Sequence, residues 1–211
     1  MKEIVKNWYN IAVYIALAVT VVLALGEWSE TQRILLASLA VIHLHFFEEF
    51  QFPGGFPLVG MTVEIRNFDH DPNTWHLNDA SSFWGNEWFA VMVYLLPLLV
   101  PQVRFLTLAA VLFAFVELLM HGVVFPACLK RLYNPGLVSA ALFLTPLSIA
   151  YFRLCDYSYL WYDWPLALIW IVVNYWMAFR SPIYKYFGSK KAYTFPEEQL
   201  EKGRKFDHIL F

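Results

Sequence analysis

The sequence predicts an all-α membrane protein, a polytopic bundle of six transmembrane helices. Two observations predict this class. Of the 211 residues, 59% are hydrophobic and only 15% are charged, whereas soluble domains average about 45–50% apolar and 25% charged residues. The apolar residues are also gathered in six segments, each close to the roughly 20 residues that a helix needs to cross a bilayer.

The first two apolar segments are joined by a short polar turn. We expect helices from about Trp8 to Gly26 and from about Thr31 to Phe50. Lys2 and Lys6 before the first segment resemble the start of a signal peptide. The apolar run is longer than the usual core of such a peptide, so a retained first transmembrane helix is predicted.

Residues 51–85 differ from the helices on either side. Prolines and glycines interrupt any helix at 51–57, and Asp and Asn residues typical of turns follow. A loop of about 35 residues is long for a compact bundle. Aromatic and aliphatic residues are scattered through it, so we expect a folded cap that contains a short helix.

The rest of the chain supplies four more helices and a tail. The third helix is expected from Ser82 or Asn86 to Val100, the fourth from Val103 to Phe125, the fifth from Pro135 to Phe152 and the sixth from Leu160 to Phe179. Residues 1–180 then form a single transmembrane bundle, and residues 181–211 form a polar, basic C-terminal tail.

The distribution of Lys and Arg predicts the orientation. With both termini inside, all but three of the 15 Lys and Arg residues lie on the cytoplasmic side. Cytoplasmic loops are enriched in these residues, so we predict an N-in, C-in topology with the 51–85 loop on the cytoplasmic side. This topology separates Cys128 from Cys155, which are therefore expected to be free thiols.

Unusual polar residues gather near the inner end of the second helix. His45, Glu48 and Glu49 are three and four residues apart, so they share one face of a helix. Ionisable groups are expensive at membrane depth and usually functional. The topology brings Glu87 and the pair Glu117 and His121, which are also four apart, to the same layer.

Carboxylates and imidazoles at helical spacing are typical of metal sites in helix bundles. We therefore expect a divalent metal, Fe, Zn or Mn, and the charge of four carboxylates would balance two ions. Glu48 and Glu87 are also candidates for a catalytic base. The predicted ligands are His45, Glu48, Glu49, Glu87, Glu117 and His121, and the outer residues that support them are Asn86, Asn134 and Asn174.

Other histidines are given structural roles. His43 is about 160° from His45 on a helical wheel, so we expect it to pack against lipid or protein. His70 and His76 are expected to be ordinary loop residues.

The stretch His45-Phe46-Phe47-Glu48-Glu49 resembles the signature of the HXXEE-domain proteins, a bacterial membrane family largely of unknown function. The resemblance covers roughly residues 35–150. It extends to three further stretches, Phe52-Pro53-Gly54-Gly55-Phe56, Asn86-Glu87 and Tyr133-Asn134-Pro135-Gly136. The resemblance implies a helical membrane protein of the bacterial cytoplasmic membrane, but no activity.

Three functions remain open from the sequence. The first is a membrane metalloenzyme that oxidises or hydrolyses a lipid or lipophilic molecule. The second is a metal-free acid–base isomerase or cyclase, broadly similar to sterol isomerases of the emopamil-binding type. The third is a metal or proton transporter or a regulatory membrane protein. Nucleic acid is not an expected partner. The residues that the second hypothesis would use are His45, Glu49, Glu87, Asn174 and Trp176.

Overall fold

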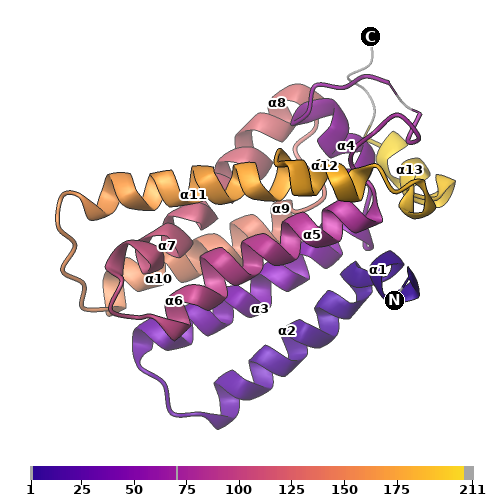
Figure 1. Cartoon of the computed structure of the whole chain (residues 1–211). Helices are drawn as coiled ribbons and strands as arrows, with labels where there is room; N and C mark the ends of the chain where they lie inside the picture. The colour runs from indigo at the N-terminus through magenta and orange to yellow at the C-terminus, as the bar shows by residue number, and fades with distance from the viewer. Residues whose placement is uncertain (1, 70, 207–211) are drawn as a thin grey trace.

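The computed structural model describes residues 2–69 and 71–206, and in this part of the chain every regular element is a helix. Long helices lie side by side along one axis, and the N-terminus and the C-terminal helices lie at the same end (Figure 1). The prediction of an all-helical protein is therefore confirmed. His70 lies outside the described residues.

Each of the six predicted apolar segments is helical. Within the described residues, four of the long helices are apolar enough to cross a membrane, namely Trp8–Leu25, Arg104–Leu129, Leu137–Leu154 and Asp163–Gly188. The other two are less apolar because they carry interior polar groups. The long helices are α2 (Trp8–Leu25), α3 (Glu30–Phe50), α5–η1–α6 (Asp79–Phe89, Ala90–Leu95, Leu96–Leu99), α7–η2–α8 (Arg104–Leu119, Met120–Val124, Phe125–Leu129), α9–η3–α10 (Leu137–Ser139, Ala140–Leu144, Thr145–Leu154) and α11 (Asp163–Phe179).

The helix boundaries follow from capping residues. α3 begins with a capping box between Ser29 and Gln32. α5 begins at Asp79, earlier than predicted, because the Asn78 side chain accepts hydrogen bonds from two backbone N–H groups of the first turn.

Four of the helices form a closed ring. α3 packs against η1, η1 against α7, α7 against α10, and α10 against α3. α2 covers the outside of α3, and α11 covers α5 and α7. The inside of the ring is therefore shielded by protein, and a polar side chain there can find partners on several helices.

Three of the long helices contain a π-helical turn, and each turn lies just before a proline. The prolines are Pro97, Pro126 and Pro146. A proline ring clashes with the carbonyl group four residues earlier and removes one hydrogen bond. In all three helices that carbonyl lies inside the π segment, so the wider turn accommodates the proline without ending the helix.

The segment after α3 folds back under the bundle. Gly54 and Gly55 adopt positive φ values of 73° and 106°, which glycine tolerates best, and α4 (Phe56–Val63) follows. The prediction of a short helix in this loop is therefore confirmed. His76 in the same loop is exposed.

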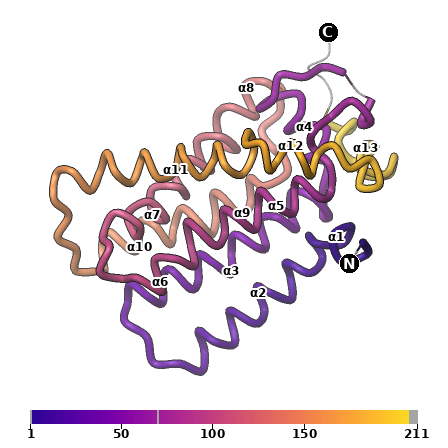
Figure 2. Tube along the Cα trace, viewed as in Figure 1, coloured from indigo at the N-terminus to yellow at the C-terminus, as the bar shows by residue number. Residues whose placement is uncertain are grey.

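The C-terminal segment also docks on the bundle. It forms α12 (Pro182–Gly188), the short η4 (Lys191–Tyr193) and α13 (Glu197–Arg204), and α13 packs against α4 (Figure 2). A Cβ atom on Gly55 would lie 2.9 Å from the backbone nitrogen of Gly203, so the two backbones are in close contact. Gln199 donates a hydrogen bond to the Tyr9 hydroxyl (3.1 Å).

Both cysteines are free, as predicted. Cys128 belongs to α8 and Cys155 follows α10, and these two helix ends lie at opposite ends of the bundle (Figure 1).

Candidate metal centre

Two histidine–glutamate pairs face each other inside the four-helix ring. His45 and Glu49 are one turn apart on α3, and Glu117 on α7 is one turn from His121 on η2. Each Nε2 atom lies near a carboxylate oxygen of its own pair and of the opposite pair. The distances are 3.5 Å from His45 to Glu49, 3.5 Å from His45 to Glu117, 3.5 Å from His121 to Glu49 and 3.3 Å from His121 to Glu117.

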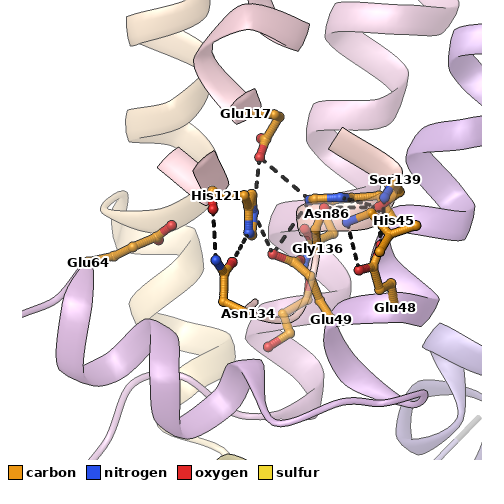
Figure 3. Close-up of polar contacts among 12 residues, drawn as sticks. His45, Glu48, Glu49, Glu64, Asn86, Glu117, His121, Asn134, Gly136 and Ser139 are labelled. Atoms are coloured by element: carbon orange, nitrogen blue, oxygen red, sulfur yellow. Dashed lines mark hydrogen bonds and ion pairs between the residues drawn. The ribbon is translucent and has the colours of Figure 1, made fainter. Parts of the chain in front are cut away.

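These four distances suit a shared metal ion better than direct hydrogen bonds. A hydrogen bond between an imidazolium and a carboxylate is about 2.7–2.9 Å long. In a tetrahedral zinc site with bonds of about 2.0–2.2 Å, neighbouring ligand atoms are about 3.3–3.5 Å apart, because a tetrahedron's edge is about 1.6 times its bond length. One donor atom each from His45, Glu117 and His121 lies within 4.8 Å of the others. Glu49 is outside this mutual set of three, although its Oε1 lies 3.5 Å from both imidazoles. The four side chains are hereafter called the ligand group (Figure 3).

Asn134 holds His121 from behind. Its Nδ2 donates to the His121 carbonyl oxygen (2.7 Å), and its Oδ1 lies 2.7 Å from His121 Nδ1. A carbonyl oxygen can only accept, so this contact fixes the orientation of the amide, and Nδ1 must carry a proton to donate to Oδ1. In a neutral ring Nε2 then carries a lone pair, which points toward the other side chains of the ligand group. Metal-binding histidines usually have such an outer partner.

Ser139 and Glu48 hold His45 in a similar way. His45 Nδ1 lies 2.8 Å from the Ser139 hydroxyl, which donates to Glu48 Oε2 (2.5 Å). The same carboxylate accepts from the backbone N–H groups of Val138 (3.0 Å) and Ser139 (2.8 Å). Glu48 therefore binds the N-terminal end of the α9–η3–α10 helix, where a negative charge is favourable. Its carboxylate supports His45 from outside the ligand group.

The loop before α9 is shaped around the His121 ring. Gly136 has a φ of 100°, and a Cβ atom there would lie 2.4 Å from His121 Cε1. On another side the Phe125 ring is stacked parallel to the imidazole, with centroids 5.0 Å apart. The ring is thus enclosed by packing as well as by hydrogen bonds, and His121 is only 1% exposed.

Two of the predicted site residues, Glu87 and Asn174, lie away from the ligand group, whereas Asn86 lines the cavity beside it. Glu87 approaches His43 instead, with Oε2 3.4 Å from Nε2. Asn86 donates to the carbonyl oxygen of Ser82 (2.9 Å). Asn174 accepts from Trp88 Nε1 (3.1 Å) and so joins α11 to α5.

The residues suggested for a metal-free isomerase do not form one group. Glu87 and Asn174 have the separate partners just described, and Trp176 is 51% exposed on the outside of α11.

An apolar cavity of about 390 Å³ adjoins the ligand group. His45, Glu49 and Glu117 line it, as does Glu64 at the end of α4. Sequence reasoning missed Glu64, which lies in the irregular segment, and Ser139, a small residue in an apolar run. The prolines and glycines at 51–57 indicated that the chain turns back there. They did not indicate the direction of the Glu64 side chain.

Comparison with known proteins supports the family and leaves the activity open. No curated protein and no solved structure matches the chain. The model of one protein family, described as "Protein of unknown function with HXXEE motif", matches residues 35–151. His45, Glu48 and Glu49 are the named residues of that motif, and more than half of the chain is matched, so the protein belongs to the HXXEE family.

Proposed function

We propose that this protein is an integral membrane metalloenzyme that hydrolyses a lipophilic substrate. The observation that carries the proposal is the set of four Nε2-to-carboxylate distances of 3.3–3.5 Å between two opposed helical pairs. Zn²⁺ suits this donor set, because it takes imidazole and carboxylate ligands, and three protein ligands are enough for a catalytic zinc site. Zn²⁺ undergoes no redox change, so hydrolysis is favoured over oxidation.

One ion fits the site better than two. The charges of Glu49 and Glu117 together balance one divalent cation. Glu48 and Glu87, which a second ion would need, contact α9 and His43 respectively. A bound Zn²⁺ would act as a Lewis acid and lower the pKa of water.

The cavity supports a lipophilic substrate. Most of its lining is aliphatic or aromatic, and ligand pockets of this kind bind molecules largely by apolar contact. Two lining residues on α11, Leu168 and Val172, are 53% and 67% exposed. We place the opening there, on the apolar outer face of α11, where a molecule dissolved in the bilayer would reach it.

We also propose that all six long helices cross the bacterial cytoplasmic membrane with both termini inside. The start of α3, the start of α7 and the end of α10 lie at one end of the bundle, and α1 (Lys2–Lys6), α12 and α13 lie at the other (Figure 1). Arg33, Arg104 and Arg153 belong to the first three of these helix ends. A tag at the C-terminus should then be protected from a membrane-impermeant label in intact cells. Labelling before lysis would contradict this topology.

The metal site can be tested by elemental analysis of protein purified without added metal. We expect close to one zinc per chain in the wild type and little in Glu117→Gln, which keeps the shape of the side chain but removes its charge. Glu87→Gln is the matched control, because Glu87 belongs to the separate pair with His43, and it should keep its metal. A metal-free wild-type protein, even after incubation with zinc, would overturn the proposal.

A transporter would also bind metal, so a second assay is needed. Zinc flux into proteoliposomes should be no faster with the protein than without it. Rapid flux would replace the enzyme by a transport function.

A further inference from the structure

Glu64 is a fourth carboxylate beside the cavity, and it comes from an element outside the helical ring. It follows the last turn of α4, and its side chain extends from the ribbon toward the ligand group (Figure 3). The residue is half-buried and lines the cavity. Its polar contact in the described structure is the Tyr175 hydroxyl, 3.5 Å from Oε2.

In the described part of the chain Glu64 forms no ion pair, although the positive charge of Arg180 is close enough to lower its pKa. The residues that line the cavity include no Lys or Arg. Burying a charged carboxylate without a partner costs on the order of several kcal/mol of folding free energy. Burial is the largest cause that raises the pKa of Glu64 to about 7; the negative charges of Glu49 and Glu117 add to it, and His121 and Arg180 oppose it. A cation bound at the ligand group would balance Glu49 and Glu117, so burial is the cause that remains when metal is bound. The titratable and charged groups around it are Glu49, Glu117, His121, Tyr175, Arg180 and Tyr184.

The lining also constrains the substrate. The cavity wall contains three glutamates and no Lys or Arg, so an anionic headgroup would meet like charges that no Lys or Arg balances. An uncharged molecule with a long apolar part avoids this penalty. Alkyl esters and amides are uncharged groups that water can hydrolyse. Each needs a proton on the oxygen or nitrogen that leaves.

We propose that Glu64 is a catalytic residue that donates this proton to the leaving atom of an uncharged, lipophilic acyl ester or amide. The inference rests on the proposed hydrolytic function. Water adds its oxygen to the acyl carbon, and the bond from that carbon to the leaving oxygen or nitrogen breaks. The leaving atom takes the proton of Glu64, which recovers one from the water. One water is consumed, an acid and an alcohol or amine are formed, and no oxidant or reductant is needed.

Two esters with the same acyl chain test the role of Glu64. Methyl laurate needs a proton on its leaving methoxide, whereas p-nitrophenyl laurate releases a stable phenolate without one. General acid catalysis contributes about 10²–10⁴-fold. Glu64→Gln should therefore lose about that factor with methyl laurate and less than about tenfold with p-nitrophenyl laurate. Its metal content should be unchanged, and Glu87→Gln should hydrolyse both esters like the wild type.

A chemical probe tests the protonation state without any turnover. Dicyclohexylcarbodiimide, a lipophilic reagent, adds to protonated carboxyl groups and leaves an N-acylurea that mass spectrometry can locate. We expect labelling at Glu64 at about pH 6, little at about pH 8.5, and none at this position in Glu64→Gln.

The outcomes separate the two proposals. If a zinc-loaded wild type hydrolyses both esters and Glu64→Gln slows them equally or not at all, the role of Glu64 is overturned and the metalloenzyme stands. Absence of the carbodiimide label at every pH has the same consequence. If the wild type binds no metal or hydrolyses neither ester, the hydrolytic function fails, and the role of Glu64 falls with it.

Discussion

Two histidines of α3, His43 and His45, are both buried beside a carboxylate, yet their surroundings differ. His43 donates from Nδ1 to the carbonyl oxygen of Leu39 in its own helix (2.7 Å) and has one acidic neighbour, Glu87. His45 has two acidic neighbours, a second imidazole whose centroid is 5.0 Å away, and a hydroxyl from another helix at Nδ1.

The comparison shows what separates a buried ion pair from a candidate metal centre. The His43 pair satisfies each group locally and leaves no set of donor atoms directed at one point. Around His45, donors from two helices converge, and residues from a third helix fix the ring behind them. The predictions below test this difference, beginning with the largest expected effect.

Removing the metal should destabilise the protein more than any single substitution. A ligand present at a thousand times its dissociation constant stabilises the folded state by about 4 kcal/mol. A strong chelator should therefore lower the midpoint of thermal unfolding in detergent, and zinc should restore it. Glu117→Gln should show no such response, and an equal response in both proteins would contradict the site.

Gly136→Ala should displace the His121 ring. The added Cβ would lie 2.4 Å from Cε1 at a backbone φ of 100°, so we expect a loss of about 1–3 kcal/mol in stability together with weaker zinc binding. Gly122→Ala is the matched control, because the nearest atom to its Cβ is 3.5 Å away. Equal zinc affinity in the two variants, measured by competition with a chelating dye, would show that the ring is not held as described.

Asn134→Ala should weaken zinc binding by about 10–100-fold, as is usual for the outer partner of a metal-binding histidine. Asn174→Ala removes a buried amide that joins α11 to α5 but does not touch the ligand group. It should lower stability while zinc affinity stays within about twofold of the wild type. The same dye competition measures both, and a reversed order would move the metal away from His121.

Glu87→Gln should have the smallest effect. The amide still reaches His43, so the free energy of unfolding should change by no more than about 1 kcal/mol. Chemical denaturation in mild detergent measures this change. A larger loss would mean that the His43 pair is an essential part of the bundle.

Helical periodicity was sufficient to pair each histidine of the ligand group with a glutamate, although the predicted ligands also included Glu48 and Glu87, which the structure places elsewhere. His45 with Glu49 and Glu117 with His121 are each four residues apart, which places both members of each pair on one face. The shared level of all four along the bundle follows from the lengths of the helices. The Asn134-Pro135-Gly136 stretch was also correctly assigned to the start of a helix.

Other features depend on contacts that periodicity does not contain. Glu48 and Glu49 are neighbours in sequence and differ by about 100° around the helix, and only the position of α9 decides which of them faces the ligand group. His43 was correctly separated from His45, but its partner Glu87 comes from another helix. Glu64 follows an irregular segment, where no repeat relates one side chain to the next.

The docking of α13 on α4 bears on the order in which the protein is made. α4 carries Glu64 at its end, and α13 follows all of the membrane helices in the chain. During synthesis the residues that line the cavity therefore all leave the ribosome before α13 does. Until α13 docks, α4 and the side chain of Glu64 at its end lack this support from behind.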